Sequence, residues 1–62
     1  MEKEILRVIN REIIKSAKKG ESYYYWDISD VDKRTIDKVS TILESEGKMV
    51  RSKGTKYKLI TW

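Results

Sequence analysis

The sequence predicts a small α+β domain in which two long helices precede a C-terminal β-hairpin. Two segments repeat apolar residues at helical spacing, a cluster of four aromatic residues lies between them, and the C-terminal residues alternate around a glycine. A chain of 62 residues buries one modest core, so a single domain over residues 1–62 is expected. The apolar residues, 39% of the chain, supply that core.

The first helix is predicted over residues 2–19. Ile5, Leu6, Ile9 and Ile13 recur at spacings of three and four, which places them on one side of a helix. Gly20 follows the last polar positions and is the residue type that most often ends a helix in a left-handed conformation.

Residues 22–26 are predicted to form a strand, because tyrosine and tryptophan favour extended structure. Residues 27–31 are too few for a full helix and are predicted to form a short helix of one or two turns. The aromatic residues fit two interpretations. Packing in the core and at its rim is favoured in so small a domain, and stacking on unpaired bases is the alternative; the residues concerned are Tyr23, Tyr25, Trp26 and Tyr57.

The second long helix is predicted over residues 32–46. Ile36, Val39, Ile42 and Leu43 share one face, and Gly47 ends the segment as Gly20 ends the first.

A β-hairpin is predicted over residues 48–61, with Gly54 in its turn. A two-residue loop would place Val50 opposite Tyr57. In that register three residues face inward and three face outward: Val50, Tyr57 and Leu59 inward, and Arg51, Lys56 and Lys58 outward.

The composition argues against catalysis. Cysteine and histidine are absent, which removes thiol nucleophiles, imidazole acid–base chemistry and soft metal ligands. Asp27, Asp30 and Asp32 cluster in sequence, but capping and turn formation explain them better than a cation does. No phosphate-binding glycine loop occurs. We therefore expect no enzyme activity, no catalytic residue, no metal, no cofactor and no small-molecule ligand.

The charge is distributed in blocks. Residues 1–20 carry a net charge of +3, residues 21–46 of −4 and residues 47–62 of +5, giving the overall +4. Basic ends around an acidic middle favour an anionic partner, most often nucleic acid, although lysines that only solvate the chain would give the same totals.

The segment from Arg34 to Val50, RTIDKVSTILESEGKMV, resembles the recognition helix and first wing strand of the winged helix-turn-helix family of DNA-binding domains. The likeness is to small transcription regulators of archaeal or viral type. Residues 48–61 look like the family's wing, so the resemblance spans nearly the whole chain. One departure is the middle helix, which is usually two to three turns long in the family, whereas only Ile28 to about Val31 is available here. Either that helix is abbreviated or the aromatic segment Tyr23–Trp26 begins it.

The resemblance implies binding to double-stranded DNA, with helix 32–46 in the major groove and the wing on the backbone or minor groove. Arg34 would be the best candidate for bidentate contact to guanine. The implied DNA-binding residues are Lys33, Arg34, Asp37, Lys38 and Thr41 on the helix and Arg51, Lys53, Lys56 and Lys58 on the wing.

The expected protein is a transcription regulator that acts as a homodimer, since one recognition helix reads only a few base pairs. The apolar candidates for the dimer surface are Val8, Ile14 and Trp62. The alternative is a winged-helix module for protein–protein interaction within a larger nucleic-acid-processing assembly, which Asp37 and Glu44 on the recognition face favour. Without a membrane span or a signal-peptide pattern, a cytoplasmic protein is expected, and the lack of Cys, Pro, His and Gln beside ten lysines leans towards a thermophile.

Overall fold

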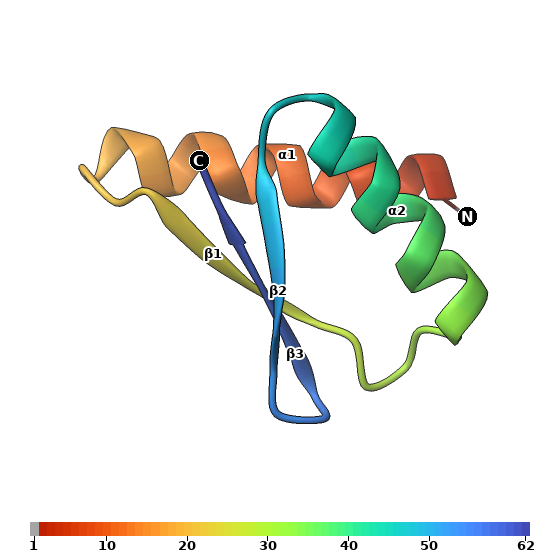
Figure 1. Ribbon diagram of the computed structural model, residues 1–62. Coiled ribbons are helices and arrows are strands. Elements are labelled where there is room, and N and C mark those ends of the chain that lie inside the picture. Colours follow the sequence, from red (N-terminus) through yellow and green to blue (C-terminus); the bar gives the residue numbers. More distant parts are fainter. Residues whose placement is uncertain (1) are drawn as a thin grey trace.

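The structure, a computed structural model, describes residues 2–62 and contains two helices and a three-stranded antiparallel sheet over that range. The elements in chain order are α1 (Glu2–Lys18), β1 (Tyr23–Asp27), α2 (Lys33–Ser45), β2 (Met49–Lys53) and β3 (Tyr57–Thr61) (Figure 1). The α+β class predicted from the sequence is confirmed, and both long helices lie within one residue of their predicted bounds.

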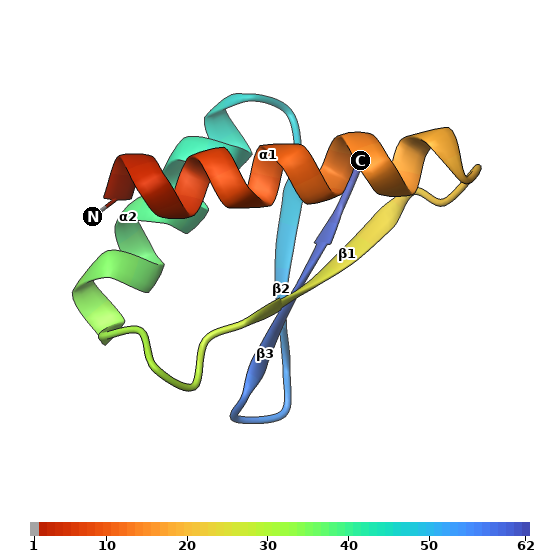
Figure 2. The same cartoon turned by 180° about the vertical axis from the view of Figure 1, so that it is seen from behind.

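The strands are ordered β1-β3-β2, so the C-terminal strand lies in the middle. In the register, Tyr25 pairs with Leu59 across β1 and β3, and Arg51 pairs with Leu59 across β2 and β3. The tip of the β2–β3 hairpin projects beyond the helices, and the start of α2 lies at that same end of the molecule in both views (Figures 1 and 2).

Both helices cover the same face of the sheet, which we call the inner face. One buried cluster joins α1, α2, β1 and β3: Ile9, Ile13, Trp26, Val39, Leu43 and Ile60. Successive side chains of a strand point to opposite faces of the sheet. Trp26 and Ile60 are buried on the inner face, so their neighbours along β1 and β3 point to the other face, which we call the outer face. Neither helix of residues 2–62 lies against that outer face (Figures 1 and 2).

The two helices end in the same way. The N–H of Glu21 donates to the Ser16 carbonyl at 2.9 Å, and the N–H of Lys48 donates to the Leu43 carbonyl at 3.1 Å. Each bond closes around a glycine of positive φ, 83° at Gly20 and 92° at Gly47, as in a Schellman motif. These glycines set the direction in which the chain enters β1 and β2.

The short helix predicted over residues 27–31 is wrong. Asp27 belongs to β1, and its carboxylate accepts hydrogen bonds from the backbone N–H and the hydroxyl of Ser29 at 2.9 and 2.7 Å. The N–H of Ile28 donates to the carbonyl of Lys56 at 2.9 Å, so the chain after β1 is held by the hairpin turn. An Asx turn and this long-range bond compete with a helix that would be too short to be stable alone.

The predicted hairpin register is also wrong. Three residues, 54–56, connect the strands in place of two, and Val50 pairs with Ile60. This odd shift reverses the faces of β3. Tyr57 and Leu59 therefore face outward, and Lys58 faces inward beside Ser52, while the predicted directions of Val50 and Arg51 are confirmed.

Candidate nucleic-acid interface

The exposed side of α2 carries the five helix residues that the sequence analysis selected. All five side chains are exposed, on the side of the helix away from the buried Val39 and Leu43, and we call them the α2 surface: Lys33, Arg34, Asp37, Lys38 and Thr41. Their position follows from the amphipathic pattern of α2, since the apolar stripe that packs on the core leaves the polar stripe in solvent.

The start of α2 is fixed by Asp32. Its carboxylate accepts hydrogen bonds from the backbone N–H of Thr35 at 3.2 Å and from the Thr35 hydroxyl at 2.6 Å. The Thr35 hydroxyl is the main cause that lowers the pKa of Asp32, and the N–H of Thr35 adds to it. Asp32 is thus ionised at neutral pH and already occupies the N-terminus of the helix, so a phosphate would have to bind elsewhere on α2.

The cations of the α2 surface are not equally free. The Nζ of Lys38 lies 3.4 Å from the Oε1 of Glu2, an exposed ion pair between α2 and α1. Lys33 and Arg34 form no ion pair with any residue in 2–62. Arg34 therefore keeps its whole guanidinium group available to a ligand.

Thr41 has limited capacity to hold a phosphate. Its hydroxyl donates to the backbone carbonyl of Asp37 at 2.9 Å within the helix. The hydroxyl proton is therefore engaged, and the methyl group and an oxygen lone pair remain for a ligand. This geometry favours contact with a thymine methyl group over a hydrogen bond to phosphate.

The four cations of the hairpin are divided between its two faces and its turn. Arg51 and Lys53 are exposed on the outer face of β2, and Lys56 lies in the exposed turn. Lys58 lies on the inner face, half-buried, and its Nζ donates to the Ser52 hydroxyl at 2.8 Å. The expectation that Lys58 joins Arg51 on one surface is wrong, because the register shift turns it to the other side.

Packing in the core and at its rim was favoured for the aromatic residues, but three of the four named in the sequence form an exposed surface on the sheet. Trp26 is buried in the core, as the packing interpretation requires. Tyr24 is half-buried on the inner face, and burial is the main cause that raises its pKa. Tyr23, Tyr25 and Tyr57 instead lie on the outer face with 44%, 49% and 43% of their surface exposed. The alternation of residues along a strand indicates which side chains share a face. It shows which face is exposed only once the register is known.

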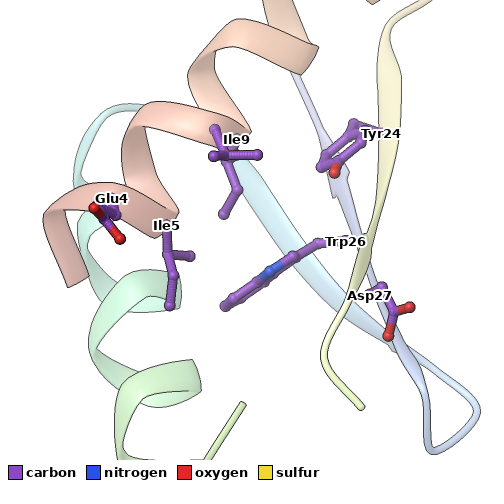
Figure 3. A pocket seen from close by; sticks show the side chains of 7 residues that line it. Glu4, Ile5, Ile9, Tyr24, Trp26 and Asp27 are labelled. Atoms are coloured by element: carbon purple, nitrogen blue, oxygen red, sulfur yellow. The ribbon is translucent and has the colours of Figure 1, made fainter. Parts of the chain in front are cut away.

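A groove of about 310 Å³ lies between α1 and β1. Ile5 and Ile9 of α1 face Trp26 across it, and Glu4 and Asp27 lie at opposite ends of the lining (Figure 3). Its apolar walls and terminal carboxylates make this groove unsuited to a phosphate backbone. The nucleic-acid candidates are therefore the α2 surface and the hairpin.

The apolar residues expected to form a dimer surface do not make one patch. Val8 and Ile14 are both exposed on α1, at 50% and 57%. Six residues of an α-helix rotate the side-chain direction by about 600°, so the two point about 120° apart. Trp62, which follows β3, is partly exposed at 39%.

Within residues 2–62, no group of three or more acidic side chains lies close enough to hold a metal ion. Neither helix of the described chain has the length and apolar character needed to cross a membrane. Comparison with protein-family models, with curated proteins and with solved structures gave no match to this chain.

Proposed function

We propose that this chain binds double-stranded DNA as a winged helix-turn-helix transcription regulator, with α2 in the major groove and the hairpin against the backbone. The observation that carries the proposal is the joint position of α2 and the hairpin. The start of α2, which bears Lys33 and Arg34, and the tip of the basic hairpin lie at the same end of the molecule (Figures 1 and 2). One duplex can therefore meet both.

Arg34 is the proposed reader of a guanine. Its side chain is exposed near the N-terminal end of α2, where a helix in the major groove meets base edges. It has no carboxylate partner in residues 2–62, so binding a base costs no existing ion pair. Asp37, one turn further along, suits a cytosine amino group, and Lys33 suits a phosphate.

The hairpin supplies phosphate contacts. Lys53 and Lys56 lie at its tip, and Arg51 lies at the middle of β2. All three are exposed and carry no ion pair within the described residues. Lys58 is not included among the proposed contacts, because its ammonium group is bonded to Ser52 on the inner face. Pairing of two chains on two half-sites would raise affinity and specificity, and a homodimer is part of the proposal.

The experiment that tests this proposal compares Lys53→Ala with Lys58→Ala in duplex binding. The anisotropy of a labelled duplex is followed at several salt concentrations for both variants and the native chain. The logarithm of the binding constant falls linearly with the logarithm of the salt concentration, and loss of one phosphate contact lowers the magnitude of that slope by about 0.9. We expect that change for Lys53→Ala and a smaller one for Lys58→Ala. No binding by the folded native chain at about 50 mM salt would refute duplex binding.

A second arm addresses sequence reading. After selection of a preferred site, Arg34→Ala should reduce the discrimination between that site and a scrambled duplex by about 1–3 kcal/mol. An equal loss of affinity on both duplexes would make Arg34 a phosphate contact and not a base reader.

The alternative function is a protein-interaction module, and the acidic residues of α2 favour it. Asp37 and Glu44 are both exposed on α2, and each would repel phosphate. Asp37→Asn separates the two functions. It should strengthen binding to a random duplex if α2 lies near the backbone, whereas a basic protein partner would be bound more weakly.

A further inference from the structure

The outer face of the sheet is a regular array of nine side chains. They form three rows across the strands β1, β3 and β2: Tyr23–Thr61–Met49, Tyr25–Leu59–Arg51 and Asp27–Tyr57–Lys53. Adjacent rows are about 7 Å apart, because side chains on one face recur every two residues. The array thus combines three tyrosines and two cations on one open surface.

The three tyrosines contact one another but are not buried. The ring centroids of Tyr23 and Tyr25 are 5.8 Å apart, and those of Tyr25 and Tyr57 are 6.5 Å apart, both with edge-to-face geometry. Each ring leaves more than two-fifths of its residue surface exposed. Mutual contacts hold the rings in place, and the exposed ring surface is free to stack on a flat partner.

Both cations lie on β2, at one edge of the array, and Leu59 separates Arg51 from Tyr25. Lys53 is the cross-strand partner of Tyr57, and Arg51 shares its row with Tyr25. The one acid of the array is Asp27 at its corner, where its carboxylate is bonded to Ser29. A ligand on this face therefore meets aromatic surface with positive charge along one side, which complements a strand of bases with its phosphates.

We propose that the outer face of the sheet binds an unpaired DNA strand, with two or three bases on Tyr23, Tyr25 and Tyr57 and the phosphates near Arg51 and Lys53. The choice of DNA over RNA rests on the function proposed above. Stacking on sheet aromatics is a common way to hold about two or three unpaired bases. The α2 surface lies on the other side of the sheet with the helices, so this site shares only Arg51 and Lys53 with the proposed duplex contacts.

A second copy of the chain is a less suitable occupant. Two-fold pairing of this face would bury two cations from each copy, with only one acid per copy to balance them. Lysine is depleted at interfaces, and burial of cations without enough acidic partners is costly because of their desolvation. A polyanion, in contrast, gains from both cations.

The experiment measures the binding of labelled oligothymidine of about 12 nucleotides to the full chain by fluorescence anisotropy. Tyr25→Ala with Tyr57→Ala should weaken this binding about tenfold or more, since each stacked ring contributes substantially. Tyr25→Phe with Tyr57→Phe keeps the rings and should stay within about threefold of the native chain. Asn10→Ala changes an exposed side chain of α1 that belongs to no proposed surface and should change nothing.

Duplex binding is measured in parallel, so that a failure of this proposal can be distinguished from a failure of the proposed function. Arg34→Ala should weaken duplex binding and leave oligothymidine binding unchanged, and the tyrosine pair should do the reverse. Equal binding of oligothymidine by the native chain and the Tyr→Ala pair would overturn the proposed platform. Tighter binding of an oligouridine of equal length would overturn the choice of DNA. A dimer in sedimentation that the Tyr→Ala pair dissociates, without oligothymidine binding, would assign the face to a second copy.

Discussion

The two faces of the sheet are built from the same strands but have opposite surroundings. The inner face places Trp26, Val50 and Ile60 against both helices, and Ile60 has no exposed surface. The outer face carries Tyr25 and Tyr57 in solvent, and no helix or strand of the described residues lies over them. Neighbouring residues of one strand therefore contribute either to stability or to a candidate binding surface, and the strand register alone decides which.

The register can be tested by an all-or-none experiment, because the chain has no cysteine of its own. Met49→Cys with Thr61→Cys places two thiols on a paired position of β2 and β3. Paired positions have Cβ atoms about 4.5–5.5 Å apart, close enough for a disulfide after small adjustment. We expect this variant to form an intramolecular disulfide on mild oxidation, detected by loss of free thiols.

The matched control is Met49→Cys with Lys58→Cys, the pair that a two-residue loop would bring together. In the observed register these positions are offset by three residues, about 10 Å along the strand, and lie on opposite faces. Their thiols should remain free. A disulfide in this control, and none in the first pair, would restore the register expected from the sequence and reverse the two faces of β3.

The next largest effect concerns stability. Ile60→Ala removes a fully buried side chain of β3 and should lower the free energy of unfolding by about 2–5 kcal/mol. Leu59→Ala removes the adjacent side chain, which is half-buried on the outer face, and should cost about 1 kcal/mol. Urea unfolding followed by tryptophan fluorescence measures both.

A domain of this size has only about 3–9 kcal/mol of stability, so Ile60→Ala can be largely unfolded in water. Ile60→Val provides a milder substitution, with an expected loss of about 0.5–1.5 kcal/mol. If Leu59→Ala proved as damaging as Ile60→Ala, the outer face would be covered in solution and the comparison between the faces would fail.

The sequence was sufficient for the helices because their information is local. The spacing of four residues between Ile5, Ile9 and Ile13 and the glycines at positions 20 and 47 located the bounds of α1 and α2 to within one residue. The short helix over residues 27–31 was mispredicted because the conformation of this segment depends on a distant partner. The bond from Ile28 to the carbonyl of Lys56 joins segments that no local pattern connects.

The α2 part of the candidate site was predictable from the sequence, whereas the hairpin part was not. The α2 surface follows from helical periodicity, so all five of its residues are exposed as expected. On β3, Leu59 and Ile60 are adjacent and both apolar. Either of the two possible registers therefore places an apolar residue on the inner face. The length of the turn decides which of the two faces inward, and it thereby decides the faces of Lys58 and Tyr57.

The smallest expected effect concerns Asp27, the one acid on the outer face. The backbone N–H of Ser29 is the main cause that lowers the pKa of this carboxyl below its usual 3.8, followed by the Ser29 hydroxyl, and Lys56 acts in the same direction. A lowered pKa in the folded state means that the ionised form stabilises the fold. That contribution is complete above about pH 4 and is lost as the pH falls through the lowered pKa.

Carbon-detected NMR titration of Asp27 should therefore give a midpoint below 3.8 in the native chain. Ser29→Ala removes the hydroxyl donor but keeps the backbone N–H, so the midpoint should rise only part of the way. Ser45→Ala removes a hydroxyl that bonds to the Ile42 carbonyl and should leave Asp27 unchanged. A native midpoint at or above 3.8 would mean that the turn after β1 is not held by Asp27. The corner of the outer face would then carry a carboxylate free to turn towards Tyr57 and Lys53, where it would compete with a bound phosphate.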